Sequence, residues 1–215
     1  MPSGSSLPSE RDLAAALGLS RTTIKRCYDE LRATKHLATY GRDGTQVQAP
    51  PQRVSPVLGR LKSFSDEMHE LGKVPGTWLI DRSVTTDRTI ASMFGRASTA
   101  EFLRLVRVRS GDGQPMTRQV AWYDLTLAPA LADWDIAGSA YKYQEDVCNA
   151  PVVWAEQSVE SVFSSPDETE TFGYASPQPC LLFKRKTFTA NNALIEYAEG
   201  CFRGDAYVYK IRLEA

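Results

Sequence analysis

The sequence predicts an α+β protein in two parts: a small helical unit with a β-hairpin, then a larger antiparallel sheet domain with flanking helices. Three observations lead to this prediction. The 215 residues are 42% hydrophobic and 24% charged, which is typical of globular domains. Pro50, Pro51 and Pro56 lie within seven residues and indicate an extended linker over 50–62. The net charge is +5 (ten basic, five acidic) before residue 63 and −6 (fifteen basic, twenty-one acidic) after it, so the two parts are expected to have different partners.

The first part is predicted to hold two short helices joined by a tight turn. Ser9 is a favourable N-cap and Gly18 a favourable C-terminal stop for the first helix, and Ser20 caps a second helix over 21–34. The apolar residues expected to be buried are Leu13 and Leu17 in the first helix, Leu19 in the turn, and Ile24, Tyr28 and Leu31 in the second helix.

The second helix is basic and rich in hydroxyl groups near its start, on the face opposite its apolar stripe. Short strands over 37–40 and 45–48, joined by a glycine turn over 41–44, are expected to form a hairpin. Two helices and a hairpin of this kind are typical of a winged helix-turn-helix domain, whose second helix enters the major groove of DNA. The alternative is a packing module whose basic face is only solvated.

The second part is predicted to alternate helices with strands. Asp-Gly and Asn-Asn turns at 111–115 and 190–192 favour two hairpins, and proline followed by acidic residues favours a helix start at 166. Apolar alternation predicts the strands, and the order helix, strand, helix, strand, strand occurs twice, which indicates a duplicated sheet. The expected helices span 64–71, 89–94, 139–148 and 166–172, and the expected strands span 77–84, 101–109, 116–123, 152–163, 181–189, 193–202 and 207–213.

Two arginines on one strand predict an anion site. Arg107 and Arg109 are two positions apart, so their side chains point to the same face of the strand. Two guanidinium groups on one face repel each other unless an anion lies between them, which favours a phosphate or carboxylate ligand. The alternatives are ion pairs with Glu101, Glu156 or Glu160, or exposure to solvent.

Enzymatic, metal-binding and membrane functions find no support in the sequence. The histidines, His36 and His69, are isolated, and there is no triad order, phosphate-binding loop or metal-ligand cluster. We therefore expect no catalytic residue, no cofactor and no metal. The four cysteines have no paired spacing, no apolar run is long enough to span a bilayer, and no secretory signal is visible. These features predict free thiols, no membrane association and a cytoplasmic location.

Residues 5–48 resemble the winged-helix domain of GntR-type bacterial transcription regulators. The resemblance rests on the strings Leu7–Ala14 and Leu17–Ile24 and on the Gly44-Thr45 pair. It implies that residues 1–49 bind double-stranded operator DNA, and that the family's first helix, which precedes these strings, is missing here. The residues that it implies for DNA contact are Arg11, Ser20, Arg21, Thr23, Lys25, Gly41 and Arg42.

Residues 63–215 resemble the UTRA ligand-sensing domain of the HutC branch of these regulators. The strings Leu105–Arg109, Asp112–Met116, Glu196–Ala198 and Phe202–Tyr207 carry this resemblance. It implies a chorismate-lyase-like sheet, a homodimer, and a small anionic effector that controls operator affinity, most commonly by releasing repression. The residues that it implies for effector binding are Phe64, Ser65, Arg107, Arg109, Gln119, Ser139, Tyr141, Glu196 and Phe202.

Several alternatives remain at this point. Members that sense sugar phosphates carry Glu-Ser at the place of Gln119-Val120 and often Tyr at the place of Phe202, so an amino-sugar phosphate is less expected here. Glu196 is an alternative partner for a cross-strand ion pair, and Tyr141 is an alternative core residue. Arg203 and Asp205 are predicted to form a structural ion pair. An effector-free DNA-binding dimer and, more remotely, a lyase-like enzyme are the competing functions.

Overall fold

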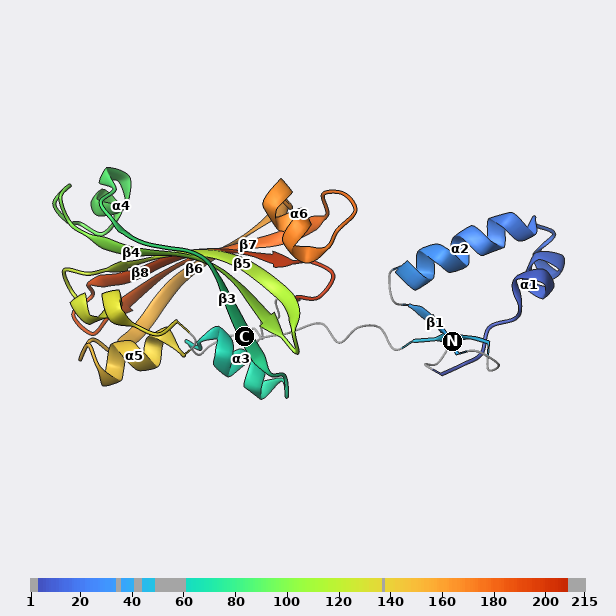
Figure 1. Ribbon diagram of the computed structural model, residues 1–215, viewed down its shortest axis with the longest axis horizontal. Coiled ribbons are helices and arrows are strands. Elements are labelled where there is room, and N and C mark those ends of the chain that lie inside the picture. The colour runs from blue at the N-terminus through green and yellow to red at the C-terminus, as the bar shows by residue number, and fades with distance from the viewer. Residues whose placement is uncertain (1–3, 34–35, 41–43, 49–60, 137, 209–215) are drawn as a thin grey trace, which may run out of the picture. The chain divides into compact units, whose positions relative to one another are not determined.

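The computed structural model describes residues 4–33, 36–40, 44–48, 61–136 and 138–208. The chain divides into two compact units, Met1–Arg53 and Val54–Ala215, and each unit has its own hydrophobic core (Figure 1). No helix in these described ranges is long and apolar enough to cross a membrane.

The first unit contains two helices and a hairpin, as the sequence predicts. Ser9 caps the first helix by accepting a hydrogen bond from the Asp12 amide at 3.2 Å, and Gly18 ends it with a φ of 66°. The hairpin strands pair antiparallel, with Leu37 opposite Val47. The elements are α1 (Glu10–Leu17), α2 (Arg21–Ala33), β1 (Leu37–Thr39) and β2 (Thr45–Val47), around a core of Ala14, Ile24, Tyr28 and Leu37.

The predicted burial of three leucines in this unit is wrong. Leu17, Leu19 and Leu31 expose 58%, 50% and 41% of their surface. Two helices and a two-stranded hairpin cover only one side of each helix, so a leucine on another side stays exposed unless a further element packs there. Among the described residues, no element does so.

The second unit is one six-stranded antiparallel sheet in the order β3-β4-β5-β8-β7-β6. Figure 1 shows α4 and α6 over one face of this sheet, and α3 and α5 over the other. The strands are β3 (Pro75–Thr85), β4 (Phe102–Gly111), β5 (Gln114–Asp124), β6 (Val152–Phe163), β7 (Pro179–Thr189) and β8 (Leu194–Arg203). The helices are α3 (Phe64–Glu70), α4 (Arg88–Met93), α5 (Ala140–Asp146) and α6 (Pro166–Phe172), with a short 3₁₀ helix at Pro129–Asp133.

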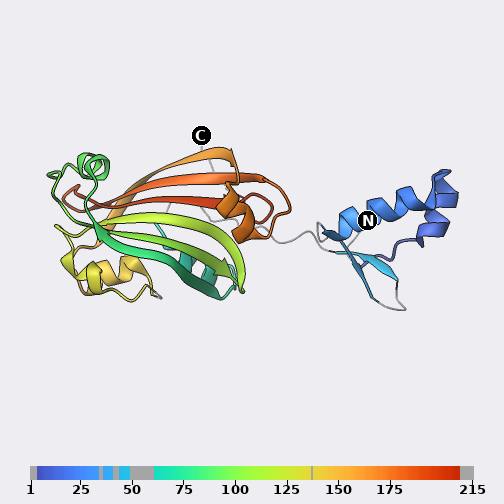
Figure 2. The same cartoon turned by 45° about the horizontal axis from the view of Figure 1, so that its top comes forward.

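The predicted duplication of the sheet domain is confirmed. The order α3-β3-α4-β4-β5 recurs as α5-β6-α6-β7-β8, and β5 pairs with β8 at the centre of the sheet. The two halves are therefore related by a pseudo-two-fold axis through the β5–β8 seam (Figure 2). The strand predicted over 207–213 stays a prediction: Tyr207 forms an isolated β-bridge outside the six strands, Val208 is in no strand, and residues 209–213 lie outside the described part of the chain.

Strand β4 connects the core of this unit to its site. The side chains of residues 103, 105, 107 and 109 point to the face that α3 and α5 cover. Leu103 and Leu105 pack in the main core with Trp134. Arg107 and Arg109 continue the same row, so this face changes from apolar to cationic along a single strand.

Candidate functional site

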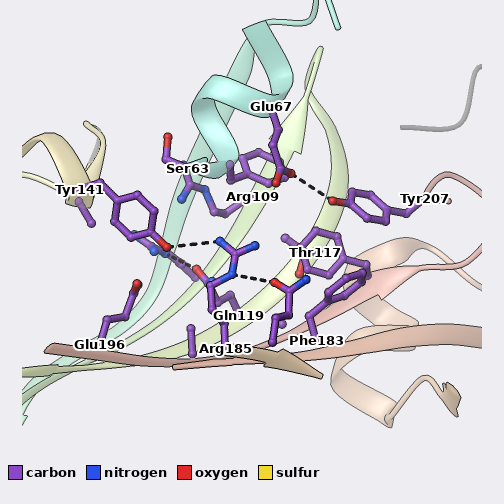
Figure 3. A pocket seen from close by; sticks show the side chains of 17 residues that line it. Ser63, Glu67, Arg109, Thr117, Gln119, Tyr141, Phe183, Arg185, Glu196 and Tyr207 are labelled. Atoms are coloured by element: carbon purple, nitrogen blue, oxygen red, sulfur yellow. Dashed lines mark hydrogen bonds between the residues drawn. The ribbon is translucent and has the colours of Figure 1, made fainter. Parts of the chain in front are cut away.

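A cavity lies between the sheet and helices α3 and α5 (Figure 3). Its empty volume is about 670 Å³, which includes the solvent at the open mouth. Both halves of the duplicated domain contribute to its lining. The charged lining residues are Glu67, Arg107, Arg109, Arg185 and Glu196.

Arg107 and Arg109 are buried in this cavity, with 2% and 5% of their surface exposed. Arg107 donates through Nε to Gln119 Oε1 at 2.9 Å and through Nη2 to the Tyr123 hydroxyl at 3.1 Å. Arg109 donates through Nη2 to Ser65 Oγ at 2.9 Å. The buried Nη1 of Arg107 and Nε of Arg109 have no acceptor among the described residues. The pair thus has donor capacity left inside the cavity.

The surroundings of Arg109 disfavour its charged form. Burial, together with the repulsion of the neighbouring Arg107, lowers the pKa of Arg109 from 12.5 to about 9, so the group is still charged at neutral pH. Its guanidinium lies 4.7 Å from the ring centroid of Phe64, which supplies a cation–π contact. In the described part of the chain neither arginine is within ion-pairing distance of a carboxylate, so the alternative pairing with Glu101, Glu156 or Glu160 does not occur.

A third arginine, which the sequence analysis missed, faces them from the other half of the domain. Arg185 donates through Nε to Gln157 Oε1 at 2.7 Å, and through Nη1 to the Tyr141 hydroxyl and the Lys62 carbonyl, both at 3.3 Å. Burial acts to lower its pKa, but Tyr141 and Glu67 outweigh that effect and raise the pKa above its ordinary value. Arg185 likewise forms no ion pair with a described residue.

The internal duplication is the feature of the sequence that could have located Arg185. Val120 pairs with Glu199 at the seam, and a two-fold axis through that pair places Gln119 of β5 onto Ala198 of β8. The cross-strand partner of Gln119 is Arg107, and that of Ala198 is Arg185. Arg185 is therefore the pseudo-symmetry counterpart of Arg107.

Two carboxyl groups complete the charged lining. Tyr207 donates its hydroxyl to Glu67 Oε2 at 3.1 Å, and burial raises the pKa of Glu67 above its ordinary value despite the nearby Arg185. Glu196 accepts a hydrogen bond from Thr187 Oγ1 at 3.1 Å and is in no ion pair with a described residue. Three guanidinium groups against two carboxyl groups make the cavity cationic.

Seven of the nine residues predicted for effector binding line this cavity: Phe64, Arg107, Arg109, Gln119, Tyr141, Glu196 and Phe202. The other two lie beside it. Ser65 is in the first turn of α3, whose N-cap is Ser63, and Ser139 caps α5 by accepting from the Lys142 amide at 3.4 Å. The binding roles of all nine stay predictions. The lining residues that the sequence analysis did not select are Ser63, Glu67, Thr117, Ala140, Gln157, Phe183, Arg185, Ala198, Gly200 and Tyr207.

Arg203 and Asp205 form the structural ion pair that the sequence predicts. Arg203 donates through Nε and Nη2 to the two Asp205 carboxylate oxygens at 2.8 and 2.7 Å. The guanidinium also lies 5.1 Å from the ring centroid of Tyr174, and neither residue of the pair lines the cavity. The pair stabilises the turn that follows β8.

The residues predicted for DNA contact are exposed where the structure describes them. Ser20 Oγ accepts from the Thr23 amide at 3.0 Å and so caps α2. Arg11, Arg21 and Lys25 have exposed side chains on α1 and α2, and the nearest carboxylate groups to the two arginines are 3.5 and 3.8 Å away. Such weak surface pairs leave these cations available for phosphate.

Gly41 and Arg42, the predicted wing residues, lie outside the described part of the chain. Within the described ranges, no three residues of the His, Cys, Asp and Glu types gather as metal ligands would.

Comparisons with known proteins agree with these two units. Residues 1–47 match the gntR family of bacterial regulatory proteins, and residues 70–208 match the UTRA domain. The HTH-type transcriptional repressor NagR of Bacillus subtilis is 29% identical over 94% of this chain and 83% of its own length. The histidine utilization repressor of Pseudomonas putida is 28% identical over 85% of this chain and 73% of its own.

A solved structure shows the same fold. The structure of PhnF from Mycobacterium smegmatis covers 100% of this chain and 94% of its own, with a TM-score of 0.71 and 22% identity. The family and the named relatives are those of transcription regulators and not of enzymes. The chain therefore belongs to the GntR family of DNA-binding transcription regulators, with a UTRA effector domain.

Proposed function

We propose that this regulator is a cytoplasmic, homodimeric repressor whose operator affinity is controlled by a small anion bound in the cavity of its UTRA domain. The observation that carries the proposal is a set of three guanidinium groups that line the cavity, those of Arg107 and Arg109 buried and that of Arg185 half-buried, without an ion pair among the described residues. The names of two relatives, both repressors, support the direction of regulation.

The electrostatics of the cavity favour an anion over a neutral ligand. Buried charges in proteins are normally paired, because an unpaired charge loses its hydration without compensation. Arg107 and Arg109 repel each other and retain unused N–H donors in the cavity. An oxyanion between them would accept those donors and remove the repulsion. Charge-assisted bonds of this kind are about twice as strong as neutral ones.

The remaining wall indicates a ligand with few hydroxyl groups. Phe183, Phe202 and Tyr207 form an aromatic cluster, with ring centroids 4.5 to 5.6 Å apart. Gln119 Oε1 already accepts from Arg107. We therefore propose a phosphate or carboxylate with an apolar portion in preference to a polyhydroxylated amino-sugar phosphate.

Helix α3 offers a route from the cavity to the DNA-binding unit. It is the first element after the linker, and Arg109 holds it through Ser65 and Phe64. Arg185 holds the carbonyl of Lys62, two residues before the helix starts. An anion that recruits both arginines would change how the end of the linker is held. In a homodimer, this would alter the spacing of two recognition helices on a palindromic operator.

The test is operator binding by the full chain. Operators are selected from a random duplex library, and fluorescence anisotropy then measures affinity with and without phosphate, alkylphosphonates and short carboxylates. We expect one anion class to weaken binding 5- to 150-fold, the usual range of allosteric coupling. Light scattering should give about twice the 23.8 kDa chain mass. If no anion alters the affinity, effector control by an anion is wrong, and if no duplex is selected, operator binding itself is wrong.

A further inference from the structure

We propose that the cavity contains two separate anion subsites, and that the effector is a molecule with an acidic group at each end. Arg107 and Arg109 form the first subsite, in the first half of the duplicated domain, and Arg185 forms the second, in the other half. This inference rests on the proposed function and adds the chemical class of the ligand: a dicarboxylate, or a phosphonate or phosphate joined to a carboxylate.

The sheet topology separates the two subsites. Strands β4 and β7 are not neighbours, because β5 and β8 lie between them. Three inter-strand steps place their backbones about 14 Å apart. The two guanidinium groups nevertheless reach one cavity, because both Arg109 and Arg185 interact electrostatically with Glu67 and Glu196. A small oxyanion bound between Arg107 and Arg109 would leave Arg185, on the other side of the cavity, without an anionic partner. A second acidic group could then pair with Arg185.

The hydrogen bonds of Arg185 leave room for an acid. The three acceptors described above for Arg185 are all neutral, and the two at 3.3 Å, Tyr141 and the Lys62 carbonyl, are long for a charged donor. Charge-assisted N–H···O bonds are usually about 2.7–2.9 Å long. A carboxylate would therefore be a stronger acceptor than either of these partners. Figure 3 shows Arg185 directed into the cavity between Tyr141 and Gln119.

The floor between the subsites suits a short apolar spacer. Ala198 and Gly200 of β8 line the cavity there, and both are small. A Cβ at Gly200 would lie 3.0 Å from the Phe202 ring and 3.2 Å from Thr117 Oγ1. The Phe202 ring and Thr117 therefore pack against this glycine, and a larger residue at position 200 would displace the Phe202 ring.

The competing interpretation is that Arg185 is only a structural tie between β7, β6, α5 and the end of the linker. It predicts that a second acidic group on a ligand adds nothing to affinity. Two series of probes distinguish the interpretations: monoacids (butyrate, valerate, propylphosphonate) and their diacid counterparts (succinate, glutarate, 3-phosphonopropionate). Isothermal titration calorimetry on the full chain at constant ionic strength gives the dissociation constants.

We expect at least one diacid to bind ten-fold or more tightly than its matched monoacid. In Arg185→Gln this gain should disappear while monoacid binding stays, and Arg185→Lys should keep part of it. Lys184→Gln is the matched control, because the neighbouring Lys184 pairs with Glu160 at 2.9 Å and does not line the cavity. It should keep the full gain.

Three other outcomes would overturn the proposal in distinguishable ways. Equal affinities for monoacids and diacids in the wild-type chain mean a single anion subsite, and the proposed function then stands without this inference. A diacid gain that survives in a folded Arg185→Gln variant assigns the second subsite to another residue. If neither series binds, the cavity is not an anion site and the proposed anionic effector fails as well. The first comparison needs no variant, so it holds even if Arg185→Gln does not fold.

Discussion

Replacing Arg109 by methionine should stabilise the ligand-free protein and at the same time abolish anion binding. Methionine fills much of the volume of the arginine stem but carries no charge. Replacing buried charged groups by apolar residues of similar volume is often neutral or stabilising by about 1–4 kcal/mol. Arg109 is a strong candidate for this effect, because Arg107 is beside it and no described carboxylate pairs with it.

The magnitude follows from the contacts of Arg109. A pKa lowered from 12.5 to about 9 corresponds to roughly 5 kcal/mol held against the charged form. The substitution also removes the hydrogen bond to Ser65, which contributes about 1 kcal/mol, and the contact with the Phe64 ring, which contributes about 1–2 kcal/mol. The expected net gain is about 1–3 kcal/mol. For a unit of this size that raises Tm by about 2–10 °C.

Intrinsic tryptophan fluorescence is a suitable assay, since all four tryptophans lie between residues 78 and 154 and report on the UTRA unit only. Arg104→Met is the matched control, because Arg104 is on the same strand but pairs with Asp81 at 2.6 Å and covers Trp122. It should lower stability by about 0.5–1 kcal/mol. If Arg109→Met lowers Tm as the control does, the buried charge of Arg109 does not destabilise the ligand-free protein, and the prediction is wrong. If it stabilises the protein but leaves anion binding intact, the anion lies elsewhere.

Three further predictions concern other groups. In the wild type, anion affinity should rise as the pH falls, because burial raises the pKa of Glu67 above its ordinary value and protonation removes a charge that repels the ligand. Glu67→Gln should therefore raise anion affinity near pH 7 and flatten this pH dependence. Calorimetry across pH 5–8 would measure both effects. Arg203→Ala should lower stability by about 2 kcal/mol, or about 4–8 °C in Tm, without changing anion affinity, since its role is packing and the turn after β8. Lys25→Ala should weaken operator binding and reduce the salt slope by about 1, whereas Arg32→Ala, whose guanidinium is tied to Asp29, should leave the slope unchanged in anisotropy titrations.

Local sequence patterns predict the elements well and burial less well. The cap residues, the Asp112-Gly113 turn and the strand alternation are short-range features, and each forms as expected, with φ values of 53° and 77° in that turn. The burial of Leu17 and Leu19 depends on what packs over a helix face, and no local pattern reports that.

The site shows the same division between local and long-range information. Arg107 and Arg109 were predictable because two residues on one strand suffice to place them on one face. Arg185 and Tyr207 reach the cavity through the pairing of β7 with β8 and the turn that follows, which join segments far apart in sequence. Only a quantitative use of the internal duplication would have paired Arg185 with Arg107 before the structure was known.

The duplicated sheet explains how binding at one cavity can reach the linker. The first half of the domain supplies α3, which continues directly from the linker, whereas the second half supplies Arg185, which binds the Lys62 carbonyl. The two halves meet along the main-chain hydrogen bonds of β5 and β8 and through side-chain contacts such as that of Tyr207 with Glu67, and a ligand across the seam would add a further connection between them. A ligand that draws Arg185 toward itself removes the hydrogen-bond donor of the Lys62 carbonyl. The free energy of ligand binding therefore depends on whether Arg185 is bonded to Lys62. The contact is a single long hydrogen bond, so the coupling it can carry is small, on the order of 1 kcal/mol. A stronger response requires Arg109 to release Ser65 in the same step, so that one ligand changes both contacts near the start of α3.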